Sequence, residues 1–199
     1  MQPFHAHTGV VAPLPRPDID TDQIIPKQFL KRLGRTGFAD ALFYDWRVDA
    51  ATGAARAFVL NDPRYAGASV LVGGPNFGCG SSREHAVWAL HDFGFRVVLA
   101  PSFADIFASN AVANGFLAAT IDEATVEAIA GLATRSPGAA ITVDLETMRV
   151  TGPDGLDAPV GLDERARTRL REGLDDIGLI LRHEDAIRRY EAAHGGVRA

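Results

Sequence analysis

The sequence contains a single cysteine, Cys79, among its 199 residues. A lone thiol excludes an internal disulfide, and it excludes any iron–sulfur or zinc site that the chain would build from several thiolates of its own. We therefore expect this chain to hold no metal, and any metal chemistry to depend on other ligands or on a partner. Because a chain without disulfides is typical of a reducing compartment, we predict a cytoplasmic protein.

Long apolar runs and an excess of basic residues are also missing. No stretch approaches the roughly 20 apolar residues that a membrane helix requires, and the N-terminus lacks the basic and then apolar pattern of a signal peptide. The chain has 20 basic and 25 acidic side chains, which gives a formal net charge of −5. Since such a chain lacks the basic face that binds a phosphate backbone, we expect neither a membrane nor a nucleic acid among its partners.

What the sequence does contain is typical of a globular chain, with 47% apolar and 23% charged residues. That length and composition suffice for one large domain with a full core. Short apolar stretches rich in β-branched residues alternate with helical patterns in the middle of the chain. The expected strands are 7–14, 68–72, 96–100 and 116–121, and the expected helices are 82–93, 102–114 and 122–133. This alternation predicts an α/β fold with βαβ units and an at least partly parallel sheet.

The remaining segments are less regular. Residues 27–57 mix aromatic and basic side chains without a clear period, which predicts loops and short helices. Residues 141–150 predict strands, and the turn residues 151–155 would close a hairpin. The tail is rich in Arg and Glu and predicts helices over 163–173 and 184–193, with solvent or another subunit on the charged face.

The most informative segment is the glycine-rich loop 73–86, which lies between an expected strand and an expected helix. A loop in this position brings the start of a helix to the carboxyl edge of the sheet, where open α/β sheets bind ligands. Backbone N–H groups and the helix dipole favour an anion there, and Ser81, Ser82 and the forked guanidinium of Arg83 add hydrogen-bond donors. The sequence therefore predicts an anion pocket that suits a carboxylate at least as well as a phosphate.

Other interpretations of this loop are weaker. Cys79 stands where a Walker loop needs lysine, and no Gly-x-Ser-x-Gly nucleophile elbow is present. A nucleophilic pair of Cys79 and His85 is conceivable, but a single cysteine is more often a small buried hydrophobe. Ser81-x-x-Glu84 also has the form of a capping box, in which Ser81 would only cap the helix, and His85 would then be a hydrogen-bonded support.

Three alternating carboxylates, Asp18, Asp20 and Asp22, invite a calcium interpretation. The segment fails as an EF-hand loop, because Gln23 stands where glycine is needed and Phe29 where the bidentate glutamate is needed. We expect the Asp and Thr side chains of this segment to hydrogen-bond to the backbone of their own loop instead.

Three separated segments together resemble one family. They are residues 20–26 (DTDQIIP), 78–86 (GCGSSREHA) and 100–107 (APSFADIF), and their order and spacing match the small subunits of 3-isopropylmalate dehydratase. Residues 34–38 (GRTGF) and 173–179 (GLDDIGL) resemble the bacterial form, so the resemblance covers nearly the whole chain. These small subunits are in turn similar to the mobile fourth domain of aconitase.

The resemblance implies a swivelling β/β/α domain over residues 1–199, with a helical extension from about 163 to 199. It implies a hydro-lyase of leucine biosynthesis that interconverts 2-isopropylmalate and 3-isopropylmalate, both small dicarboxylates, through 2-isopropylmaleate. The chain would be active only with a large subunit, as a heterodimer or heterotetramer. In the family a [4Fe–4S] cluster on the large subunit binds the leaving hydroxyl, which agrees with the single cysteine here.

Residue roles follow from the same resemblance. Ser81 matches the serine that removes the carbon-bound proton, and Ser82 and Arg83 match positions that hold a substrate carboxylate. The positions with supporting roles are Asp22, Glu84 and His85. Because a serine hydroxyl is a poor base, the pocket would have to stabilise the alkoxide of Ser81 with backbone N–H groups and Arg83.

Substrate choice in the family is attributed to the loop that is residues 27–32 here. Phe29 and Leu30 would face an isopropyl group, whereas Lys31 and Arg32 leave a citrate-like or homocitrate-like substrate open. The alternatives are therefore a small subunit of a related hydro-lyase, of homoaconitase or methylmalate type, and a non-catalytic carboxylate-binding module in which Ser81 is only a cap.

Overall fold

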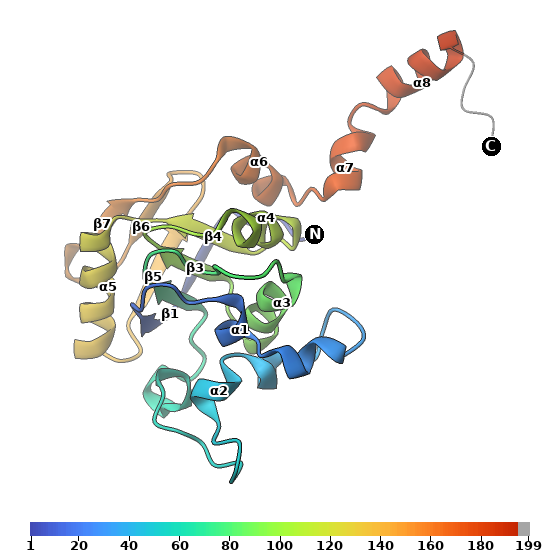
Figure 1. The fold of residues 1–199 in the computed structure, drawn as a ribbon. Coiled ribbons are helices and arrows are strands. Elements are labelled where there is room, and N and C mark those ends of the chain that lie inside the picture. The colour runs from blue at the N-terminus through green and yellow to red at the C-terminus, as the bar shows by residue number, and fades with distance from the viewer. Residues whose placement is uncertain (195–199) are drawn as a thin grey trace.

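Seven strands form one mixed sheet in the order β4-β3-β2-β1-β5-β6-β7 (Figure 1). The computed structural model describes residues 1–194, with the backbone alone for Asp176. The strands are β1 (Ala6–Leu14), β2 (Val70–Gly73), β3 (Val97–Ala100), β4 (Leu117–Thr120), β5 (Ala140–Asp144), β6 (Arg149–Thr151) and β7 (Asp157–Pro159). Strands β1 to β4 pair in parallel, and β5, β6 and β7 add antiparallel neighbours. The predicted α/β fold with a partly parallel sheet is confirmed.

Helices connect the parallel strands. The α-helices are α1 (Thr21–Ile24), α2 (Tyr44–Arg47), α3 (Glu84–Phe93), α4 (Asp105–Ala113), α5 (Glu123–Arg135), α6 (Glu164–Glu172), α7 (Asp176–Leu181) and α8 (Glu184–His194). The 3₁₀ helices are η1 (Lys27–Lys31), η2 (Ala39–Ala41), η3 (Val59–Asn61), η4 (Pro63–Tyr65) and η5 (Pro153–Gly155). Residues 27–57 thus form loops and short helices, as the sequence predicts, and η5 lies in the turn that joins β6 to β7. Helices α1 and α7 were not expected.

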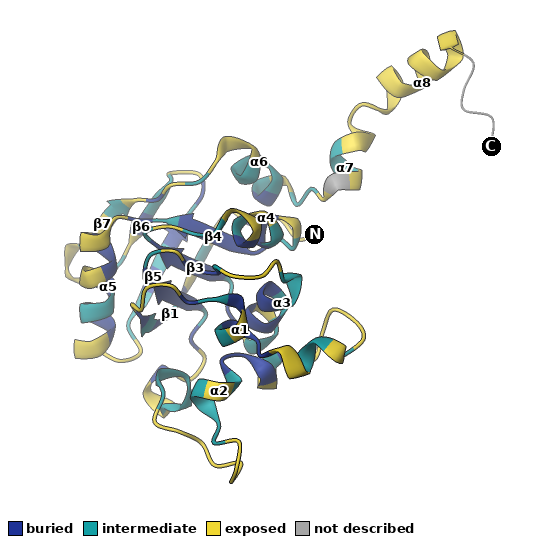
Figure 2. Ribbon diagram, in the orientation of Figure 1, coloured by how far each residue is buried: buried dark blue, intermediate teal, exposed yellow. Residues whose placement is uncertain are grey.

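The parallel strands send alternate side chains into two separate cores. Leu71 and Val98 belong to the core that α3 and α4 cover, together with the aromatic side chains of residues 38–46. Val70 and Val97 belong to the second core, which α5 and Leu170 of α6 complete. Strands β2, β3 and β4 are therefore buried on both faces, and Figure 2 shows them as a dark band between the helices.

The sheet curls until its two edges meet. Thr120 at the end of β4 and Gly161, just after β7, exchange two backbone hydrogen bonds, of 2.9 and 2.7 Å. Sheets close in this way when strand twist brings their edges together. Soon after this bridge, the chain enters α6 at Glu164.

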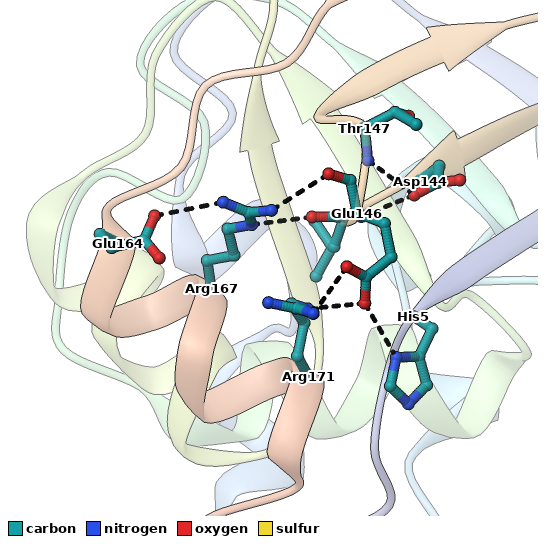
Figure 3. A network of polar contacts seen from close by, with 8 residues as sticks. His5, Asp144, Glu146, Thr147, Glu164, Arg167 and Arg171 are labelled. Atoms are coloured by element: carbon teal, nitrogen blue, oxygen red, sulfur yellow. Dashed lines mark hydrogen bonds and ion pairs between the residues drawn. The ribbon is translucent and has the colours of Figure 1, made fainter.

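Helix α6 is fastened to the turn between β5 and β6 by two arginines (Figure 3). Arg167 donates to the carbonyl oxygens of Leu145 and Glu146, at 2.8 and 3.1 Å. Arg171 donates to both carboxylate oxygens of Glu146, at 2.8 and 2.6 Å. Because Leu170 on the same helix is fully buried, α6 is part of the folded body.

Three loops leave the parallel strands at one edge of the sheet and continue to pair. After β1, the N–H of Thr21 donates to the carbonyl of Cys79, in the loop after β2, at 2.8 Å. That loop pairs on its other side with the loop after β3, through two 3.0 Å bonds between Phe77 and residues 102–104. The strand order is therefore kept in the loops, and the three segments that carry the family resemblance become neighbours.

Gly78 sets how closely the middle loop approaches α4. Its φ is +78°, and a Cβ at this position would lie 2.3 Å from the ring of Phe107. Only glycine combines this backbone conformation with this packing.

Replacing Gly78 with Ala is expected to lower the free energy of unfolding by more than the same change at Gly67. Gly67 also has a positive φ, +74°, but a Cβ there meets no atom within 4 Å, so it reports backbone strain alone. The difference between the two variants should be about 1–3 kcal/mol, the usual cost of overpacking. Urea unfolding measures it. Equal losses in the two variants would show that Phe107 does not restrict this loop.

A second prediction concerns Glu146, whose pKa the Arg171 hydrogen bonds hold below the ordinary value. Since the folded pKa lies below the unfolded one, the ion pair stabilises the fold above the ordinary carboxyl pKa, and that contribution is lost as the pH falls through the lowered pKa. Arg171→Gln should move the pKa of Glu146 upward in an NMR titration. Arg165→Gln, on the same helix, is the control and should leave it in place. An unmoved pKa in Arg171→Gln would contradict the assignment.

Candidate active site

A cavity of about 250 Å³ lies where the three paired loops meet the start of α4. Its lining combines two glycines, two hydroxyl side chains, a guanidinium and a carboxylate with apolar side chains. The lining residues are Thr21, Gly78, Gly80, Ser81, Arg83, Ala104, Asp105, Ile106 and Phe107. A larger cavity, of about 570 Å³, lies between α4, β4 and α6 and includes none of the sequence-predicted site residues. The smaller cavity is therefore the candidate site.

Ser81 lines this cavity, whereas Ser82 is not among its lining residues; both serines are exposed and precede α3. The capping-box alternative for Ser81 is wrong. Helix α3 starts at Glu84, its N-cap is Arg83, and no side chain caps it. Among the described residues, the Oγ of Ser81 has no hydrogen-bond partner, whereas its backbone carbonyl accepts a 2.8 Å bond from the Oγ1 of Thr21. The backbone of Ser81 is held while its hydroxyl is left available.

Arg83 is paired with Asp22 across the two loops. Two guanidinium nitrogens, Nη1 and Nη2, donate to the two carboxylate oxygens at 2.5 and 3.0 Å. Only 14% of the Arg83 side chain is exposed, against 52% of the Asp22 side chain. The predicted carboxylate fork is therefore formed, and in this chain it holds a carboxylate of the protein itself.

Glu84 and His85 support the packing of α3. The amide of Asn114, at the end of α4, donates to Glu84 at 2.9 Å and accepts from the indole N–H of Trp88. His85 packs edge-on against Phe38 and close to Trp88, with ring centroids 5.4 and 4.6 Å apart. Within the described part of the chain, the support from His85 comes from ring packing and not from the hydrogen bond that we expected.

Cys79 has no features of a nucleophile. Burial raises the pKa of its thiol, and the carboxylates of Asp20 and Asp18 raise it further, which disfavours the reactive thiolate. Its backbone forms a bridge with Asp20, and the imidazole of His85 is occupied with the aromatic cluster. We therefore discard the Cys79–His85 pair.

The acidic loop 18–22 is organised by its own polar groups. Asp20 caps α1 by accepting from the N–H of Gln23 at 2.7 Å, and the side chain of Gln23 accepts from the N–H of Asp20 at 3.0 Å. The capping box of this site is thus at Asp20 and Gln23. The expectation of local bonding is right for Asp20. It is wrong for Asp18, Thr21 and Asp22, whose side chains bind residues of the neighbouring loop 76–83.

The loop expected to face the substrate is mostly engaged with the protein itself. Phe29 packs edge-on against Tyr44, and the guanidinium of Arg32 lies over the Phe29 ring and binds Asp40. Leu30 is half-buried against the core and is not among the residues that line the cavity. Lys31 is exposed.

Sequence reasoning missed the apolar wall of the cavity, which comes from α4. Ile106 is 51% exposed there although it is a large hydrophobic residue, and Ala104 and Phe107 adjoin it. The signal was present in residues 100–107, which the resemblance includes but which suggested no individual role.

The donor set does not suit a metal cofactor. Within residues 1–194, no group of three or more His, Cys, Asp or Glu side chains is placed to hold a metal ion. The single thiol cannot supply the several thiolates of an iron–sulfur cluster. Over the same residues, no helix is both long and apolar enough to cross a bilayer.

Three family models match the sequence. The model described as the aconitase C-terminal domain matches residues 1–124, and a second model, LeuD, matches residues 127–159. A third model, which describes the C-terminal domain of the 3-isopropylmalate dehydratase small subunit, matches residues 176–195. The match to the aconitase C-terminal domain model thus ends at residue 124, in the first turn of α5.

Curated relatives and a solved structure agree with these models. The chain is 59% identical over 194 residues to the 3-isopropylmalate dehydratase small subunit of Koribacter versatilis, covering 98% of this chain and all of that protein. The small subunits of a Nocardioides species and Frankia alni are 55% and 54% identical, over 96% of this chain and 94% and 95% of theirs. A crystal structure of a 3-isopropylmalate dehydratase from Methanocaldococcus jannaschii has a TM-score of 0.67 at 22% identity, over 93% of this chain and 99% of that one, and is similar in fold. Because these curated relatives are 54–59% identical over 94–100% of their own length, the chain belongs to the family of 3-isopropylmalate dehydratase small subunits.

Proposed function

We propose that this chain, with a large subunit, interconverts 2-isopropylmalate and 3-isopropylmalate by losing and regaining water through 2-isopropylmaleate, in leucine biosynthesis in the cytoplasm. The observation that carries the proposal is the meeting of three separated motif segments around one cavity, with the hydroxyl of Ser81 unengaged beside Arg83. Residues 1–194 would swivel as one domain over the active site, and the helical extension from about residue 163 would move with it. The last five residues of the expected domain, 195–199, lie outside the described residues.

Ser81 acts as the base in this proposal. Its Oγ, as the alkoxide, takes the proton from the carbon next to a carboxylate, the C–O bond on the neighbouring carbon breaks, and the electron pair of the C–H bond becomes the double bond of 2-isopropylmaleate. Rehydration returns the proton to one carbon and the hydroxyl to the other. The positive end of the α3 dipole, which no side chain caps, and the guanidinium of Arg83 favour the alkoxide.

Arg83 and Ser82 hold a substrate carboxylate. Asp22 occupies Nη1 and Nη2 of the guanidinium, and this pairing orients the largely buried Arg83 side chain. A guanidinium has five N–H donors, so donors remain for a second carboxylate. Asp22 is thus a positioning residue. Ile106 and Phe107 offer the apolar surface that an isopropyl group needs.

The cluster belongs to the other chain in this proposal. The residues here do not suit it, and the family resemblance implies a [4Fe–4S] cluster on the large subunit. That cluster supplies the Lewis acid for the departing hydroxyl. The small subunit supplies the base and a carboxylate site, so neither chain is active alone.

Ser81→Ala is expected to lower kcat by about 10²–10⁴-fold, because it removes the proton acceptor. Ser82→Ala is the matched control and should raise KM with a smaller effect on kcat. The assay is hydration of 2-isopropylmaleate by the chain mixed with a cluster-loaded large subunit. Full activity in Ser81→Ala would move the base to the other subunit. Turnover of a homologous tricarboxylate but not of isopropylmaleate would favour a homoaconitase-type enzyme.

Arg83→Lys keeps the charge but loses the planar fork. We expect KM to rise about tenfold or more, with a smaller change in kcat, because a lysine cannot bind Asp22 and the substrate with the same geometry. Arg64→Lys, at an exposed ion pair with Asp62, should leave both constants unchanged. An unchanged KM in Arg83→Lys would remove this residue from the carboxylate site.

A further inference from the structure

The last two helices, α7 and α8, extend away from the body of the molecule (Figure 1). We name residues 176–194 the arm. Figure 2 shows that its described residues are mainly exposed, in contrast to the helices that cover the sheet. Five large apolar side chains of the arm are open to solvent, at 38–68% exposure: Ile177, Ile180, Leu181, Ile187 and Tyr190.

The arm begins from a fixed point. Helix α6 is held by its arginine contacts to the β5–β6 turn and by the buried Leu170 (Figure 3). It ends at Gly173 in the left-handed conformation, and the carbonyl of Gly173 accepts a hydrogen bond from the amino group of Met1. An ion pair between Arg182 and Glu172 links the arm back to α6. Contacts with the folded body therefore hold the start of the arm, whereas the apolar side chains of the arm are exposed to solvent.

The exposed apolar residues lie on one side of each helix. At 100° per residue, Ile177, Ile180 and Leu181 fall within about 100° on α7, and Ile187 and Tyr190 lie about 60° apart on α8. The opposite side of α8 carries Asp185 and Arg189. This is the pattern of an amphipathic segment whose apolar side meets another surface.

Such helices need that surface to be stable. Isolated helices shorter than about 12–15 residues are marginal in water, and α7 has 6 residues and α8 has 11. An amphipathic helix in an apolar groove is a recurrent mode of recognition, with anchors at positions i, i+3 and i+4, which is the spacing of Ile177, Ile180 and Leu181 on α7.

The matches of the family models indicate what covers the arm. The aconitase C-terminal domain model matches only residues 1–124 and so leaves the arm out, while the arm matches a model specific to these small subunits. A domain at the C-terminus of a longer chain is held to its neighbours by the peptide bond. A separate subunit must be held by contacts alone, and the arm, which matches a model of these small subunits, offers exposed apolar side chains for such contacts.

We propose that the arm docks, through Ile177, Ile180, Leu181, Ile187 and Tyr190, in an apolar groove of the large subunit and tethers the two chains. This inference rests on the proposed function. A tether that starts at α6 lies outside the candidate site, so it holds the chains together without restricting the three loops around Ser81.

The test is a double variant, Ile180→Gln with Leu181→Gln, in the full chain. Both side chains are 58% exposed, so the fold and its urea midpoint should be unchanged. The Kd for the cluster-loaded large subunit, measured by titration calorimetry, should rise by about 10²-fold or more, since two buried aliphatic side chains are lost from the interface. Turnover at saturating large subunit should return to that of the unaltered chain, because the site is untouched.

Two further variants keep the result specific. Arg189→Gln, on the opposite side of α8, is the matched control and should leave the Kd unchanged. Ile187→Gln with Tyr190→Gln should repeat the loss from the other helix.

Three outcomes would overturn the proposal. An unchanged Kd in both double variants, with the unaltered chain binding normally, would exclude the arm but leave the proposed function intact. Loss of a homodimer of this chain in sedimentation, without loss of the mixed complex, would make a second copy the occupant. Failure of the unaltered chain to bind the large subunit at all would contradict the proposed function itself.

Discussion

Backbone pairing beyond the ends of the strands is the constraint on which the candidate site depends. Strands β1, β2 and β3 lie side by side in parallel, and their loops remain hydrogen-bonded after the sheet has ended. This pairing brings Thr21, Ser81 and Ile106 to one cavity although they come from different parts of the chain. The middle loop leaves no room for a side chain at Gly78, because this residue lies directly against the ring of Phe107. The site is therefore a property of the sheet as much as of its side chains.

The pairing of Arg83 with Asp22 gives the site a defined charge arrangement before any substrate arrives. A largely buried guanidinium without a partner would be costly, and the carboxylate offsets that cost. The same contact fixes the direction in which the remaining donors point. Electrostatic sites are effective when their dipoles and charges are already in place, since no reorganisation is then needed during the reaction.

The sequence predicted the parallel half of the fold well, because the buried strands and the helices between them follow simple apolar patterns. The glycine-rich loop and the resemblance pointed to Ser81 and Arg83, and both residues line the cavity. It did not predict the partner of Arg83, since nothing in local spacing indicates that residue 22 will lie beside residue 83. The capping-box pattern at Ser81 was misleading because α3 begins only at Glu84, with Arg83 as its extended N-cap, and the real box formed at Asp20.

Other features depend on tertiary structure alone. The bridge between Thr120 and Gly161 has no sequence signature, because it arises from the accumulated twist of seven strands. Helix α7 was missed since its apolar residues cover no part of this chain. The role expected for Leu30 was inferred from family resemblance, and whether the loop around it contacts a substrate depends on surfaces outside this chain.

The closed sheet also affects how the small subunit behaves while it is alone. An open edge of unpaired N–H and C=O groups is a template for another strand, and chains with such edges are prone to aggregate. Here one edge strand has four residues, the other has three and ends in Pro159, and the two edges are bonded to each other at Thr120 and Gly161. Addition of a strand from a second molecule is therefore disfavoured. The edges of this sheet therefore give the isolated chain no ready template for aggregation by strand addition.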